Sequence, residues 1–154
     1  MYKRQAQLYQ EIDPISIGIT HENQITGGLN SGIAFCDINN DYLEDMVFGS
    51  DDELKLYLNK GDGSFEDISI LSGLSPANTL TAGVCTGDLN NDGYVDIIVY
   101  GKKNNPGKMF INNGNETFTE ISSSAGINIF DGVYDDRNGG YSICLLYTSD
   151  AADE

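Results

Sequence analysis

The sequence has few basic residues, few cysteines and a single histidine. Eight lysines and arginines stand against 24 aspartates and glutamates, so the formal net charge is −16. Binding to phosphate needs a basic surface, so this balance argues against nucleic acid as a partner, and it disfavours an anionic membrane surface for the same reason. His21 lies in a polar stretch, and no serine or cysteine has a recognisable base nearby in the sequence. We therefore predict that this segment is not an enzyme.

The cysteines are too few to predict a disulfide framework. Cys36 directly precedes an aspartate and Cys85 lies three residues before one, so the two are not equivalent positions, and small buried hydrophobic residues are the expected role for both. High charge with little hydrophobicity is typical of disorder. Here the acidic residues lie in loops between apolar runs, which favours an ordered β protein.

Both ends of the chain resemble translated sequencing adapter. Residues 1–5 read Met-Tyr-Lys-Arg-Gln and residues 144–154 begin Cys-Leu-Leu-Tyr-Thr-Ser, and common adapter DNA encodes both strings. The alternative is that both ends are natural. On the adapter interpretation, residues 6–143 are a fragment of a longer reading frame, and only they enter the fold argument.

A nine-residue acidic loop occurs twice, at residues 37–45 and 88–96. Both copies place oxygen-bearing side chains at positions 1, 3, 5 and 9, a donor set that suits a hard cation such as calcium. Three carboxylates in one tight loop also resist joint ionisation unless a cation neutralises them. The predicted calcium ligands, with the carbonyl oxygen at position 7 in each loop, are Asp37, Asn39, Asp41, Leu43 and Asp45 in the first site and Asp88, Asn90, Asp92, Tyr94 and Asp96 in the second. The alternative is a pair of Asx-type turns without metal.

The two loops differ at position 6, where a sharp turn favours positive φ. Gly93 suits that conformation, whereas Tyr42 would be strained in it, so we predict tighter calcium binding at the second site. An EF-hand or dockerin loop is a further alternative. Those loops need an acidic ligand at position 12, where this chain has Phe48 and Val99 in apolar runs.

The loops belong to a repeat of about 50 residues. In the first copy, short strands are predicted at residues 33–36, 46–48, 54–58 and 65–68, and the first two are almost wholly apolar, so burial should fall from the first strand to the last. Lys60-Gly61-Asp62-Gly63 and Asn113-Gly114 predict hairpin turns. Four strands per repeat favour an all-β fold, a β-propeller fragment with two four-stranded blades, over a β-sandwich with metal loops. The predicted divisions are the end of a preceding blade at 6–26, blades at 27–77 and 78–130, and the start of a further blade at 131–143.

At these residues the chain resembles the FG-GAP/VCBS repeat family, whose blades also occur in the integrin α-subunit head. The family pattern, Asp-x-Asp/Asn-x-Asp-Gly-x-x-Asp followed by Asn-x-Gly-x-Gly-x-Phe, continues here in Asn59-Lys60-Gly61-Asp62-Gly63-Ser64-Phe65. Tyr42 and Glu116 replace glycines of the pattern. The resemblance implies a propeller with structural Ca²⁺ in an extracellular or cell-surface protein.

The function that the resemblance implies is a calcium-binding scaffold for adhesion or binding. Its expected partners are the remaining blades of the parent chain and a protein or glycan ligand, without membrane insertion in this segment. The alternative is a non-catalytic or substrate-binding propeller module of a secreted hydrolase or lyase.

Overall fold

The computed structural model describes residues 10–20, 32–49, 54–74, 81–101 and 107–126. The predicted adapter segments 1–5 and 144–154 and the predicted start of a further blade at 131–143 lie outside these residues. Of the predicted end of a preceding blade, residues 10–20 are described. Within the described residues, no helix is long and apolar enough to cross a membrane.

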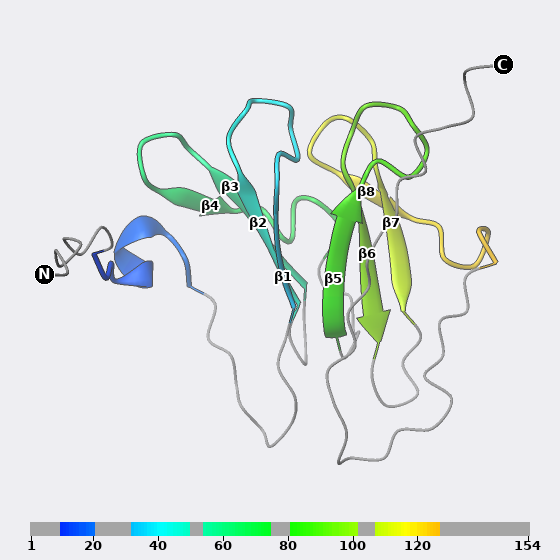
Figure 1. Cartoon of the computed structure of the whole chain (residues 1–154), viewed down its shortest axis with the longest axis horizontal. Helices are drawn as coiled ribbons and strands as arrows, with labels where there is room; N and C mark the ends of the chain where they lie inside the picture. Colours follow the sequence, from blue (N-terminus) through cyan, green and yellow to red (C-terminus); the bar gives the residue numbers. More distant parts are fainter. Residues whose placement is uncertain (1–9, 21–31, 50–53, 75–80, 102–106, 127–154) are drawn as a thin grey trace, which may run out of the picture.

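Eight strands form two separate antiparallel sheets of four, which follow one another along the chain (Figure 1). The first sheet has the order β1-β2-β3-β4, with β1 at Ile33–Cys36, β2 at Asp45–Gly49, β3 at Leu54–Asn59 and β4 at Phe65–Asp67. The second repeats it as β5-β6-β7-β8, with β5 at Thr81–Gly87, β6 at Asp96–Gly101, β7 at Lys108–Asn112 and β8 at Phe118–Glu120. The all-β prediction of two four-stranded blades is confirmed.

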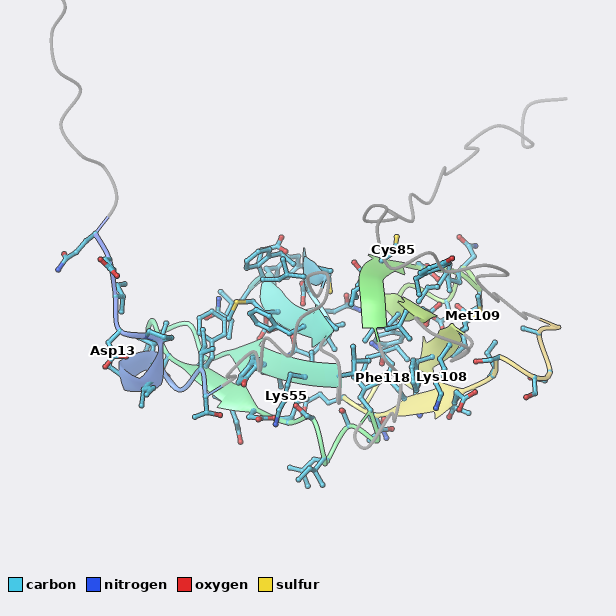
Figure 2. The ribbon with its side chains drawn as sticks, turned by 90° about the horizontal axis from the view of Figure 1, so that it is seen from below. Asp13, Lys55, Cys85, Lys108, Met109 and Phe118 are labelled. Atoms are coloured by element: carbon cyan, nitrogen blue, oxygen red, sulfur yellow. The ribbon has the colours of Figure 1, made fainter. Side chains whose placement is uncertain are left out.

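The two sheets share one register. Phe35 pairs with Met46 and Met46 with Tyr57 across β1, β2 and β3. Thr86, Ile97 and Phe110 form the matching row across β5, β6 and β7. Outer-strand ion pairs also recur, from Lys55 to Asp67 at 3.2 Å and from Lys108 to Glu120 at 3.4 Å. The two lysines are labelled in Figure 2.

The hydrophobic core lies between the sheets, because each sheet contributes one apolar face to it. The first sheet supplies Val47, Leu56 and Leu58 among others, and the second supplies Ile97, Val99, Phe110 and Phe118. Figure 2 shows Phe118 between the two sheets. At the inner strands the backbones approach so closely that a Cβ on Gly32 would lie 2.5 Å from the Val84 nitrogen, so glycine is required there.

The predicted fall in burial from first to last strand is wrong for the first sheet. Ile33 and Phe35 on β1 are 48% and 59% exposed, whereas β2 and β3 are largely buried. The apolar composition of β1 predicts that other parts of the protein cover both faces of this strand. Among the described residues, only the face toward the second sheet is covered at this strand.

A short 3₁₀ helix, η1 at Pro14–Ile17, precedes the first sheet and begins at Asp13, whose side chain accepts a hydrogen bond from the Ile15 N–H at 3.1 Å. The following Gly18 lies against β4, since a Cβ there would overlap the Phe65 carbonyl. The turn after β4 meets β8 in the same manner, with the Phe118 N–H donating to the Ser72 carbonyl at 2.8 Å. Each turn thus contacts the outer strand of the sheet that follows it.

Candidate metal centre

The two acidic loops fold alike, each joining the first and second strands of its sheet. In the first, the N–H groups of Asp41 and Tyr42 donate to the Asp37 carboxylate at 3.0 and 2.8 Å, and the Asp41 N–H also reaches Asn39 Oδ1 at 3.2 Å. The Leu43 N–H donates to Asp41 Oδ1 at 2.8 Å. These Asx-type turns hold the side chains of positions 1, 3 and 5 over the loop backbone.

The second loop repeats this pattern almost bond for bond. Asp88 accepts from the N–H groups of Asp92 at 3.1 Å and Gly93 at 2.9 Å, Asn90 Oδ1 accepts from Asp92 at 3.1 Å, and Asp92 Oδ1 accepts from Tyr94 at 2.9 Å. Asn90 Nδ2 additionally donates to Asp92 Oδ2 at 2.8 Å. Two loops of different sequence reach one geometry because the oxygen-bearing positions are the same.

The position-9 aspartates are buried where loop and sheet meet. Asp45 Oδ2 accepts from the Ile38 N–H at 2.9 Å and Asp45 Oδ1 from the Asn59 N–H at 2.8 Å, so one carboxylate joins the loop to β3. Asp96 does the same with Leu89 and Asn112, both at 2.8 Å. Desolvation by burial raises the pKa of both carboxyls. The N–H donors act against this rise, whereas the negative charges of the position-1 and position-5 aspartates in the same loop add to it.

The backbone at position 6 is left-handed in both loops. Gly93 has a φ of 88° and Tyr42 a φ of 68°, so Tyr42 adopts the strained conformation that its alignment with glycine predicted. The Tyr42 side chain is 96% exposed. Asn40 and Asn91, at position 4, also have positive φ, which asparagine tolerates better than most residues.

Two asparagines anchor the loops by hydrogen bonds, although the sequence alone assigned neither of them a role. Asn59 Nδ2 donates to the Glu44 carbonyl at 3.2 Å, and Asn112 Nδ2 donates to the Val95 carbonyl at 3.1 Å. Asn112 Nδ2 also crosses to the other sheet, where it donates to the Ile38 carbonyl at 2.9 Å. Each asparagine is the first residue of an Asn-x-Gly segment at the end of the third strand of its sheet. This repeated motif is the feature of the sequence from which their role could have been predicted.

The two loops lie side by side at one edge of the sheet pair. Besides the Asn112 bond, Asn40 Nδ2 donates to the Gly93 carbonyl at 3.1 Å. One loop therefore contacts the backbone of the other directly.

The donor chemistry of both loops fits calcium, since each offers three carboxylates and one amide oxygen and neither has a nitrogen or sulfur ligand. An ionised carboxylate has about four lone-pair sites, so an oxygen that accepts one N–H can still face a cation. Among the residues that the structure describes, no group of three or more His, Cys, Asp or Glu side chains is gathered into a metal-holding cluster. The carboxylates face their own backbone amides, and the ten predicted ligands remain a prediction.

The surroundings of the loops exclude a helix–loop–helix unit. Strands flank both loops, with β1 and β2 around residues 37–45 and β5 and β6 around residues 88–96. Phe48 and Val99, at position 12, lie within β2 and β6. The EF-hand alternative is therefore wrong.

Comparison with known proteins agrees with this geometry. A family model described as FG-GAP-like repeat matches residues 37–99, from the start of the first acidic loop into β6. Residues 37–99 belong to the FG-GAP-like repeat family. The matched stretch contains both FG-GAP-like loops in full.

Relatives of the chain include Cartilage acidic protein 1 of Xenopus tropicalis, which is 37% identical over 105 residues that make up 66% of this chain and 16% of that protein. Cartilage acidic protein 1 of Homo sapiens is 37% identical over 71 residues, which are 44% of this chain and 11% of that protein. The matched stretches thus span less than a fifth of the length of these relatives.

A second departure from the FG-GAP pattern lies in the turn between β7 and β8. Gly63 has a φ of 91° in the first sheet, and its counterpart Glu116 has a φ of 65° in the second. Each FG-GAP-like unit therefore keeps one residue with a side chain where the backbone favours glycine, Tyr42 in one and Glu116 in the other.

Proposed function

We propose that this chain is a calcium-stabilised pair of β-propeller blades that serves as an extracellular binding scaffold. The observation that carries the proposal is the pair of equivalent acidic loops, which adopt one hydrogen-bonding pattern and touch each other through Asn40 and Asn112. Two oxygen-rich loops with the same ordered backbone at one edge support a structural metal, because the backbone is already fixed and only the carboxylates, which face their own amides, would have to turn toward an ion.

The chain's own residues would hold and position the ion. Backbone N–H donors fix the side chains at positions 1, 3 and 5 of each loop, which are Asp37, Asn39 and Asp41 in the first and Asp88, Asn90 and Asp92 in the second. The buried Asp45 and Asp96 tie each loop to the third strand of its sheet. When bound, calcium would supply positive charge to carboxylates that otherwise repel one another.

Thermal unfolding tests the metal part of the proposal. Calcium at about one hundred times its dissociation constant adds about 2.7 kcal/mol to the free energy of unfolding for each occupied site, which raises the melting temperature by several degrees. Asp41→Asn and Asp92→Asn should each remove part of that rise. Asp62→Asn, in the exposed turn before β4, is the matched control and should keep it. Equal melting temperatures in calcium and in chelator would contradict the proposal.

The scaffold part of the proposal places a protein or glycan ligand on the blade edges, with further blades of the parent chain as packing partners. The acidic composition favours a ligand with basic or neutral groups. The test is a glycan and protein array probed with the calcium-loaded parent protein, beside a hydrolase and lyase screen. Calcium-dependent capture without turnover supports the proposal, and turnover abolished by a point change in these blades overturns it.

A further inference from the structure

The turn between β7 and β8 contains the triplet Asn115-Glu116-Thr117, an asparagine with a threonine two residues later and no proline between them. Such a triplet is the acceptor sequence for an N-linked glycan in proteins that enter the secretory pathway. No other asparagine of this sequence has a serine or threonine two residues after it. A motif of three residues needs structural support, and the folded turn supplies it.

The turn presents the Asn115 side chain to solvent. Asn115 and Glu116 are exposed and Thr117 is half-buried. The Asn113 N–H donates to the Thr117 carbonyl at 2.9 Å and closes the turn at the end of the hairpin. Figure 1 shows this turn on the same edge of the sheets as the two acidic loops. A glycan on Asn115 would therefore extend from a hairpin tip, and neither sheet would have to open to receive it.

The hydrogen bonds of the turn use the amide oxygen of Asn115 and leave its nitrogen available. Asn115 Oδ1 accepts from the Thr117 N–H at 3.3 Å and from Thr117 Oγ1 at 2.6 Å. Nδ2 donates to no residue in the part of the chain that the structure describes. Attachment of a glycan replaces one hydrogen of Nδ2 and leaves Oδ1 unchanged, so both hydrogen bonds survive the modification.

The counterpart turn in the first sheet shows that this geometry does not require an amide. Asp62 Oδ1 accepts from the Ser64 N–H at 2.9 Å and from Ser64 Oγ at 2.6 Å, and the Lys60 N–H donates to the Ser64 carbonyl at 3.0 Å. A carboxylate thus holds the first turn as the Asn115 oxygen holds the second. The turn itself therefore gives no role to the Asn115 nitrogen, which is the atom that a glycan needs.

We propose that Asn115 is an N-glycosylation site, whose donor is an oligosaccharide carried on a lipid diphosphate. Nδ2 attacks the anomeric carbon of the oligosaccharide, and a carbon–nitrogen bond forms as the bond from that carbon to the diphosphate oxygen breaks. The lipid diphosphate leaves with the electron pair of the broken bond, and the amide nitrogen loses one proton to a base of the transferase. The site rests on the extracellular part of the proposed function, because a chain meets this donor on its way out of the cell.

The glycan would stand beside the second acidic loop and leave the first one bare. A Cβ on Gly114 would lie 2.8 Å from Tyr94 Cζ, so the turn packs against a side chain of the second loop. The equivalent turn beside the first loop has Asp62, which cannot accept an N-linked glycan. A ligand that binds this edge of the blades would then have freer access to the first loop than to the second.

The test is translation of the full chain behind a cleavable secretory leader in the presence of endoplasmic reticulum microsomes. Only imported chains are scored, which have lost the leader and resist added protease. They should carry one glycan that peptide N-glycosidase removes and that peptide mapping places on Asn115. Asn115→Gln and Thr117→Ala should abolish the glycan, whereas the matched control Thr117→Ser, which keeps the hydroxyl, should retain it.

A second measurement asks whether the folded turn accepts the modification. The glycosylated chain and the same chain made without glycan in a bacterial cytosol should melt at the same temperature. Imported parent chain without a glycan, a glycan that persists in Thr117→Ala, or a clearly lower melting temperature of the glycosylated chain would each overturn the site. Because the leader is supplied, these results do not depend on calcium or on a ligand. Failure of calcium-dependent capture by a glycosylated protein would instead count against the proposed function alone.

Discussion

The replacement Tyr42→Gly should stabilise the protein, because the backbone of Tyr42 is held in a strained left-handed conformation and its exposed side chain makes no buried contact that offsets the strain. Its φ is 68°, its counterpart Gly93 has a φ of 88°, and the tyrosine is 96% exposed. A residue with a Cβ costs about 1–2 kcal/mol in this conformation. The greater conformational freedom of glycine in the unfolded chain lowers the free energy of unfolding by about 0.5–1 kcal/mol. We expect a net gain of about 1 kcal/mol.

Urea unfolding of Tyr42→Gly at fixed calcium measures this gain as a higher midpoint with an unchanged slope. Tyr42→Ala separates the backbone from the ring, since alanine removes the ring and keeps the Cβ, so its stability should stay near that of the parent. Gly93→Tyr is the converse change. A Cβ at Gly93 would meet nothing within 4 Å, so its expected loss of about 1–2 kcal/mol comes from the backbone alone. If Tyr42→Gly matched Tyr42→Ala, the strain argument would be refuted.

Four further outcomes are expected. Asp45→Ala leaves the N–H groups of Ile38 and Asn59 without their acceptor in a buried site and should cost about 3 kcal/mol in urea unfolding; a loss below about 1 kcal/mol would show that the carboxylate is not a structural link. Tyr57→Phe removes a buried hydroxyl that has no hydrogen-bond partner in the described part of the chain, so it should be neutral or stabilising by about 1 kcal/mol, and a large loss would reveal a hydrogen bond at that oxygen. Gly32→Ala places a Cβ 2.5 Å from the Val84 nitrogen and should cost about 1–3 kcal/mol, whereas an unchanged midpoint would mean that the sheets separate freely there. Burial raises the pKa of the Cys36 thiol to about 12, so peptide mapping after alkylation near pH 8 should find Cys36 unmodified while the protein is folded, and rapid modification would contradict its burial.

The strands were predictable because their apolar runs are short and bounded by turn residues. The predicted strand 33–36 coincides with β1, and the predictions at 46–48, 54–58 and 65–68 fall within one residue of β2, β3 and β4 at each end. The positive φ of Tyr42 was predictable as well, because the second copy has glycine at that position. A repeat supplies its own comparison, and each copy indicates what the backbone of the other needs.

Contacts between the sheets could not be predicted in the same way. The Asn112 bond to Ile38 joins residues 74 apart, and nothing near either residue indicates the other. The exposed side of β1 was missed for the same reason, since a strand of apolar residues has the same sequence pattern whether one face or both are covered. The buried carboxylates at positions 45 and 96 were expected to ligate metal, and their hydrogen bonds to β3 and β7 became visible only once the loop and the third strand were placed together.

Calcium titration of the metal-free chain in a calorimeter tests the central claim most directly. The account predicts two bound ions per chain, with the tighter binding event abolished by Asp92→Asn and the weaker one by Asp41→Asn. The absence of saturable binding, or binding that persists when both aspartates are replaced, would contradict it.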